Sequence, residues 1–162
     1  DLHLSIRRQR QMCIRDRPGV IETAEGEEIG QHEGLMYHTL GQRKGLHIGG
    51  LAKYGDDPWY VVDKDVARNV LIVGQGNENS GLYSKKLIAS KPEWINTEVP
   101  ELPLRCNAKI RYRQGDQPCT VNAVSRNQVE VNFNDLQRAV TPGQYVVFYQ
   151  GERCLGGSII QQ

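Results

Sequence analysis

No apolar run in the sequence approaches the length of about 18 residues that a membrane-spanning helix needs. No apolar segment follows the first basic residues, as a secretory signal requires. Hydrophobic residues make up only 38% of the 162 residues, although a chain of this length still buries roughly 70% of its unfolded surface and can form a core. We therefore expect a cytoplasmic protein with no membrane contact.

The sequence also lacks the residue spacings of a metal site or a disulfide framework. Its four cysteines contain no Cys-x-x-Cys pair and follow no regular spacing: Cys13, Cys106, Cys119 and Cys154. Reduced thiols are therefore expected. His32, His38 and His47 are separated by six and nine residues, which suits neither one helical face nor a tight chelating turn. No metal ligand is predicted, and no order of Ser, His and Asp residues indicates a catalytic site.

Charge of one sign is concentrated at the start of the chain. The net charge is +1, but residues 1–17 carry five Arg and two Asp, so the remaining residues are negative overall. Nucleic-acid binding would therefore depend on a local basic patch. Residues 1–17 show neither a helical nor a strand period, and they could be an RNA-binding arm or a segment foreign to the fold. We favour a non-native or disordered segment, because SIRRQRQMCIRDR resembles translated adapter sequence.

From Pro18 onward the sequence predicts a mainly β protein. The chain contains 17 Gly and 7 Pro, which favours frequent turns over long helices. Residues 19–22 and 28–30 flank an acidic turn, and the β-branched runs 59–63 and 69–73 predict a second hairpin. Three prolines between residues 90 and 104 indicate a connection between two units. We expect a central β-rich domain at 18–96 and a second domain at 97–162.

The second domain has the pattern of a small antiparallel barrel. Short apolar runs are separated by turn residues every 8–12 positions, which predicts five or six strands. The pair Gly156-Gly157 falls within the last of these strands, where the absence of a Cβ favours a bulge or a barrel corner.

A cationic strand is the strongest candidate for a binding surface. Polar and apolar residues alternate between residues 105 and 113, which places four cations on one face: Arg105, Lys109, Arg111 and Arg113. Positions two apart rise by roughly 6.5–7 Å, near the spacing of successive phosphates on one nucleic-acid strand. Tyr112 would point to the opposite face unless the strand twists or ends there. The alternative is a solvated outer face with no ligand.

A glycine-rich loop at residues 39–45 is a second candidate. Its backbone N–H groups, with Arg43 and Lys44, could meet a phosphate. It is not a P-loop, because no Lys-Ser or Lys-Thr pair follows a glycine at the required spacing. An exposed turn with two cations remains the simpler alternative.

Four segments carry a resemblance to a known family: GEEIGQHEGLMYHTLGQRKGL (26–46), PWYVVDKD (58–65), RYRQGDQPCTV (111–121) and AVTPGQYVVFYQGERCLGGSII (139–160). From about Pro18 to its end, the chain resembles the C-terminal part of the bacterial tRNA-specific 2-thiouridylases. The resemblance implies an ATP-dependent sulfurtransferase that thiolates the wobble uridine of tRNA and receives sulfur from a relay protein. It also implies a central β-rich domain and a C-terminal barrel like those of translation factors. The catalytic ATP-pyrophosphatase domain would lie upstream, so we expect the present chain alone to need no cofactor and to be inactive.

The resemblance also implies which residues contact the tRNA anticodon stem-loop. The family's contacts fall on the Arg-Tyr pair of RYRQ and the Gln of TPGQ, here Arg111, Tyr112 and Gln144. Strand geometry adds Lys109 and Arg113. Further candidate RNA contacts lie in the glycine-rich loop: Gln42, Arg43 and Lys44. The alternative function is a free-standing translation-factor-like barrel that binds RNA or protein without catalysis.

Overall fold

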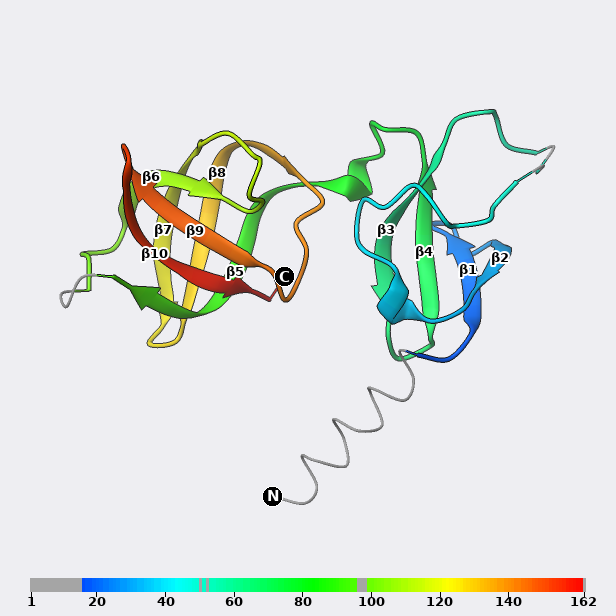
Figure 1. Ribbon diagram of the computed structural model, residues 1–162, viewed down its shortest axis with the longest axis horizontal. Coiled ribbons are helices and arrows are strands. Elements are labelled where there is room, and N and C mark those ends of the chain that lie inside the picture. The colour runs from blue at the N-terminus through cyan, green and yellow to red at the C-terminus, as the bar shows by residue number, and fades with distance from the viewer. Residues whose placement is uncertain (1–15, 50, 52, 96–98, 162) are drawn as a thin grey trace, which may run out of the picture. The chain divides into compact units, whose positions relative to one another are not determined.

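The computed structural model describes residues 16–49, 51, 53–95 and 99–161. It divides the chain into two β-rich units between Leu82 and Tyr83 (Figure 1). The expected boundary at 96/97 lies too late, because the strand at residues 83–94 contains Pro92, the first of the three prolines, and pairs within the second unit. Residues 1–15, most of the segment that we expected to be foreign to the fold, lie outside the described residues.

The first unit is a four-stranded mixed sheet with the order β2-β1-β4-β3. Its strands are β1 (Gly19–Thr23), β2 (Glu28–His32), β3 (Trp59–Asp65) and β4 (Val70–Gln75). Both predicted hairpins are confirmed, since β1 pairs with β2 and β3 pairs with β4 in antiparallel fashion. The two hairpins join through parallel pairing of β1 with β4.

The core of this unit lies on one face of the sheet. Alternate β-branched and leucine side chains of β1, β3 and β4 are fully buried there, among them Ile21, Val61 and Leu71. Leu35 closes the core from η1 (Leu35–Tyr37), a 3₁₀ helix of one turn. A second 3₁₀ turn, η2 (Ser80–Leu82), ends the unit.

The second unit is a closed antiparallel barrel of six strands, as the sequence predicted. The strand order around the barrel is β10-β5-β8-β7-β6-β9. The strands are β5 (Tyr83–Trp94), β6 (Leu104–Lys109), β7 (Gln117–Ser125), β8 (Gln128–Arg138), β9 (Tyr145–Gln150) and β10 (Arg153–Ile160). Closure leaves no free sheet edge, and β5 is the strand that joins β8 to β10.

The barrel interior is filled by apolar side chains at alternate strand positions. Val129, Val131 and Phe133 of β8 point inward, and Phe148 of β9 is fully buried. Trp94 stacks on Phe148 with 5.5 Å between the ring centroids. Burial of one such aromatic side chain contributes about 1.5–3 kcal/mol, so this interior determines the stability of the unit.

The predicted bulge in the last strand is present. The register of β10 against β9 shifts between Cys154 and Gly156. Gly156 has a positive φ of 152°, and a Cβ at this position would overlap the carbonyl oxygen of Glu93 on β5. Only glycine allows the two strands to approach this closely.

Candidate nucleic-acid interface

The predicted four-cation strand face is not formed. Strand β6 ends at Lys109, the last residue that pairs with β9, and residues 111–113 form a turn. The backbone N–H of Gln114 donates to the carbonyl oxygen of Arg111 at 3.1 Å and closes this turn. The backbone N–H of Ile110 donates to Gln114 Oε1 at 3.2 Å instead of to a neighbouring strand. Alternation of residue types therefore continues past the point where the strand stops.

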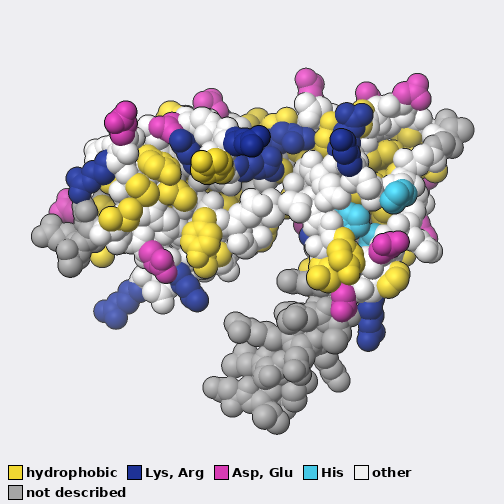
Figure 2. Space-filling model, viewed as in Figure 1, with side chains coloured by type: hydrophobic (Ala, Val, Ile, Leu, Met, Phe, Trp, Pro, Cys, Tyr) yellow, Lys and Arg dark blue, Asp and Glu magenta, His cyan; other side chains and the backbone are white. Residues whose placement is uncertain are grey.

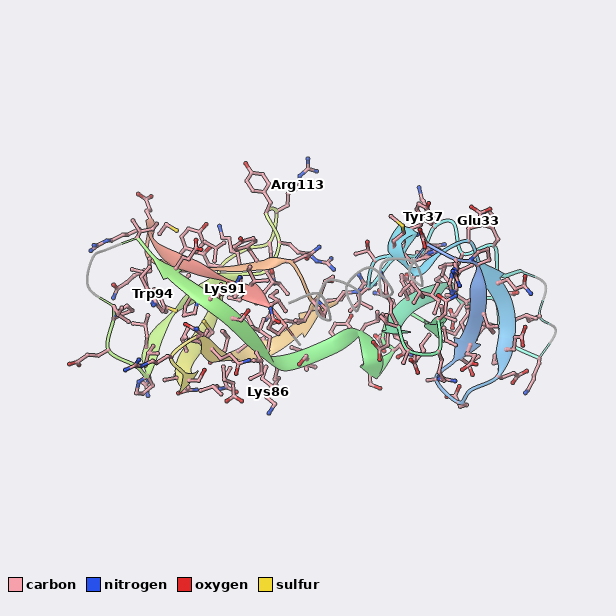
Figure 3. All side chains as sticks on the ribbon, turned by 90° about the horizontal axis from the view of Figure 1, so that it is seen from below. Glu33, Tyr37, Lys86, Lys91, Trp94 and Arg113 are labelled. Atoms are coloured by element: carbon pink, nitrogen blue, oxygen red, sulfur yellow. The ribbon has the colours of Figure 1, made fainter. Side chains whose placement is uncertain are left out.

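The turn exposes three consecutive side chains. Arg111, Tyr112 and Arg113 are all exposed, and Tyr112 is 98% exposed. The strand ends before Tyr112, which is the exception allowed above, and a turn does not alternate its side chains between two faces. Figure 3 shows Arg113 projecting from the barrel unit. An aromatic ring flanked by two guanidinium groups can stack on a base while the cations meet phosphates.

Arg111 connects this turn to the loop that carries Gln144. Its Nη2 donates to the carbonyl oxygen of Ala139 at 3.3 Å, and the hydroxyl of Thr141 donates to the same oxygen at 3.0 Å. The backbone N–H of Gln144 donates to the carbonyl oxygen of Thr141 at 3.2 Å. The structure thus joins two of the residues singled out by the family resemblance through a short hydrogen-bonded path. Both Arg111 and Gln144 are exposed.

This loop is also tied to the end of the barrel. The carbonyl oxygen of Gln144 accepts from the backbone N–H of Ile160 at 2.8 Å, and Gly143 donates to the carbonyl oxygen of Ile160 at 2.8 Å. Tyr145, the next residue, is 55% exposed. Figure 2 shows Lys and Arg side chains beside exposed hydrophobic side chains on the barrel unit. We call residues 111–113 together with Gln144 the candidate RNA-contact surface.

Lys109 is held by the protein itself. Its Nζ lies 3.0 Å from Asp116 Oδ1 and 5.2 Å from the centroid of the Tyr149 ring. The hydrogen bond to Asp116 raises the pKa of Lys109. Because Asp116 offsets its charge, Lys109 fastens the two ends of the 110–116 segment together and contributes less free positive charge than the sequence indicated.

The glycine-rich loop of the first unit is also structured by its own side chains. Gln42 Oε1 accepts from the backbone N–H of Thr39 at 2.9 Å, and its Nε2 donates to the carbonyl oxygen of Lys44 at 2.9 Å. Its backbone pairs with Val61 of β3. The side chain of Gln42 thus shapes the loop, whereas Arg43 and Lys44 remain exposed. Arg43 also lines a pocket of about 620 Å³ within this unit.

Two buried histidines lie beneath this loop. His32 is 3% exposed and His38 is 7% exposed, with 5.9 Å between their ring centroids. Burial lowers the pKa of both imidazoles, and the positive charge of Lys64 lowers each further. No group of His, Cys, Asp and Glu side chains among residues 16–49, 51, 53–95 and 99–161 is placed to hold a metal ion. Both imidazoles are buried in the first unit.

A thiol pair in the barrel was not visible in the sequence spacing. Cys106 of β6 and Cys119 of β7 are directly opposite each other, and their Sγ atoms are 3.8 Å apart. The S–H of Cys119 can donate to Cys106, which lowers the pKa of Cys106 and raises that of Cys119. Knowledge of the strand register would have been needed to find this pair.

Comparison with known proteins matches both units. A family model described as aminomethyltransferase beta-barrel domain matches residues 84–160, and one described as tRNA methyl transferase PRC-barrel domain matches residues 11–75. The tRNA-specific 2-thiouridylase MnmA of Marinomonas sp. (strain MWYL1) is 60% identical over 144 residues, which are 89% of this chain. Those of Pseudomonas entomophila and Yersinia enterocolitica are 59% and 58% identical over 90% of this chain. The chain belongs to the tRNA-specific 2-thiouridylase family.

The matched region is a C-terminal part of these relatives. The chain spans 37% to 39% of the length of the three proteins named above. The barrel match begins at residue 84, next to the division of the structure at Leu82/Tyr83. The first match begins at residue 11 and so includes part of the segment 1–17 that we expected to be foreign. In the described part of the chain, no helix is both long and apolar enough to span a membrane.

Proposed function

We propose that this chain is the tRNA-binding part of a tRNA-uridine 2-sulfurtransferase. Family membership supports the choice of tRNA, because the relatives carry the name tRNA-specific 2-thiouridylase. The whole enzyme would use ATP to thiolate the wobble uridine with sulfur from a relay protein. The present chain would hold the anticodon stem-loop against the catalytic domain and would itself neither hydrolyse ATP nor thiolate tRNA. Adenylation of tRNA by purified 1–162 would contradict the proposal that the chain alone is inactive.

One observation carries the proposal: the turn at 111–113 presents Arg–Tyr–Arg side chains to solvent beside the loop of Gln144. A tyrosine that is 98% exposed contributes almost nothing to the core. Stacking of one base on such a ring is worth about 1–3 kcal/mol. Arg111 and Arg113 supply charge for the backbone phosphates on either side, and the amide of Gln144 can bond to a ribose or a base edge.

The match to both units also bears on the alternative function. The same relatives align with about nine tenths of the chain, so the barrel and the mixed sheet occur together in them. This favours a part of a tRNA-modifying enzyme over a free-standing barrel.

The test is a titration of unmodified tRNA, and of an isolated anticodon stem-loop, with chain 1–162 at several salt concentrations. The variant Arg111→Ala should weaken binding about fivefold to tenfold and reduce the salt slope by about 0.7–0.9, the value for one lost phosphate contact. Tyr112→Ala should weaken binding by at least about fivefold, whereas Tyr112→Phe should retain most of it because the ring remains.

Arg126→Ala is the matched control. Arg126 is exposed in the turn after β7, whereas residues 111–113 precede β7. The two ends of the nine-residue strand β7 are about 26–27 Å apart. Arg126→Ala removes the same charge and should change the affinity less than twofold. Equal losses for Arg111→Ala and Arg126→Ala, or binding that does not respond to salt, would contradict the proposed surface.

A further inference from the structure

A buried glutamine lies beneath the RNA-contact turn. Gln137 of β8 is only 1% exposed, although its amide is fully polar. Its Oε1 accepts from Gln114 Nε2 at 2.6 Å, and its Nε2 donates to Gln117 Oε1 at 3.1 Å and to the carbonyl oxygen of Asp135 at 3.0 Å. One side chain of the barrel wall therefore bonds to two side chains of the segment that carries the turn.

The two partner glutamines extend this network to both ends of the turn. Gln114 Oε1 accepts from the backbone N–H of Ile110, the residue before Arg111. Gln117 Nε2 donates to the carbonyl oxygen of Gly115 at 3.1 Å. These side chains thus form hydrogen bonds with the backbone N–H of Ile110 and the backbone carbonyl of Gly115, which lie beyond the end of β6 and have no strand partner. A buried polar group is retained at little cost only when it is bonded in this way.

The same end of β8 also holds the guanidinium of Arg111. Ala139, two residues after Gln137, accepts the hydrogen bond from Arg111 Nη2 and has a positive φ of 52°. The side chain of residue 137 thus bonds to the base of the turn, and the carbonyl of residue 139 bonds to its arginine. Movement of this strand end would change the position of both.

We propose that Gln137 is a positioning residue for tRNA binding, which holds the 111–113 turn in the conformation that contacts RNA. This inference rests on the proposed function of the surface. The role requires an amide, because residue 137 must accept one hydrogen bond and donate two. A carboxylate of the same shape can accept but cannot donate, and leucine can do neither. Preorganisation of the turn raises affinity, since its ordering cost is met before the RNA binds.

The closing experiment compares tRNA affinity of Gln137→Glu with that of the unsubstituted chain between pH 5 and 8. At pH 8 the carboxylate faces the oxygens of Gln117 and Asp135 without a proton, and we expect affinity to fall about fivefold to twentyfold. As the pH falls, the carboxyl group gains a proton that it can donate, so the ratio of the two affinities should return toward one. Gln137→Leu should lose affinity to a similar extent at every pH.

Two controls separate positioning from general destabilisation. Val131→Ala removes a fully buried side chain from the same strand, and it should lower thermal stability while leaving affinity within twofold. In a Tyr112→Ala background, Gln137→Glu should change affinity less than it does alone, because both substitutions act through one turn.

The outcomes distinguish the two proposals. A ratio that is independent of pH, or an undiminished effect of Gln137→Glu in the Tyr112→Ala background, would overturn the positioning role while the proposed function stands. Absence of salt-sensitive tRNA binding by the unsubstituted chain would overturn the proposed function, and the RNA-positioning role with it.

Discussion

The substitution Gly156→Ala tests whether the bulge in β10 is needed for closure of the barrel. Gly156 pairs with Phe148 on one side and with Trp94 on the other. An added Cβ would overlap the carbonyl oxygen of Glu93 and lie 2.9 Å from the Cα of Trp94. Both are backbone atoms, so no side-chain rotation can relieve the contact. The strands β10 and β5 would have to separate.

Two costs add to give the expected magnitude. A non-glycine residue in this region of φ costs about 1–3 kcal/mol, and overpacking against a fixed backbone costs about 1–3 kcal/mol more. We therefore expect Gly156→Ala to lower the free energy of unfolding of the barrel by about 4 kcal/mol. For a unit of roughly 80 residues, each kcal/mol corresponds to about 4–8 °C, so the melting temperature should fall by more than 10 °C.

Thermal and urea unfolding followed by the fluorescence of Trp94, in a Trp59→Phe background, measures this loss. Gly151→Ala is the matched control, because Gly151 has a φ of 60° but no atom within 4 Å of an added Cβ. It should cost only about 1 kcal/mol, the price of the backbone conformation alone. If Gly156→Ala costs no more than Gly151→Ala, the close approach of β10 to β5 does not limit closure.

Two further predictions concern the cysteines and the histidines. Treatment with a thiol oxidant should join Cys106 and Cys119, seen as loss of two free thiols. The bond should stabilise the barrel by about 3 kcal/mol, because it restricts the conformations of the unfolded chain. Cys106→Ser should abolish the effect, and an unchanged thiol count would contradict the prediction. Folding lowers the pKa values of His32 and His38. Above the unfolded value of about 6.5 both imidazoles are neutral and folding is not opposed. As the pH falls from there through the folded pKa values, the unfolded chain binds protons more readily than the folded protein, so stability is lost. The urea midpoint of the first unit should thus fall between about pH 6.5 and 5, and a midpoint that stays constant over this range would contradict the prediction.

The local elements were predictable because each depends on neighbouring residues. The hairpins of the first unit follow from β-branched runs around short turns, and the bulge follows from two adjacent glycines in a strand. The domain boundary depends on distant pairing. Proline-rich composition after residue 90 indicated a linker, but a closed barrel needs β5 between β8 and β10, and β5 extends to Trp94. Amino-acid composition does not show which strands pair to close the barrel, so it could not place β5 in the second unit.

The candidate RNA-contact surface also depends on pairing between distant residues, which the sequence did not predict. Sequence resemblance proposed Arg111, Tyr112 and Gln144 as contacts, but it did not predict the hydrogen bonds that join the turn to the loop. Alternating polar and apolar residues lie on opposite faces only where the chain is a paired strand. The pairing of β6 with β9 ends at Lys109, so the rule does not apply to residues 111–113. Beyond Lys109 the backbone N–H of Ile110 bonds to Gln114, and Gln114 bonds to Gln137, which is 23 residues away in the sequence.

The turn suits RNA binding better than the strand that the sequence predicted. On a strand, Arg111 and Tyr112 would lie on opposite faces, and the tyrosine would be directed into the barrel while the arginine met solvent. In the turn, both side chains and Arg113 are exposed together. A phosphate contact and a base-stacking contact can then be made by consecutive residues of one short segment. If this reasoning holds, losses of tRNA affinity on Arg111→Ala and Tyr112→Ala should be coupled in a double-mutant cycle, because both depend on the same turn.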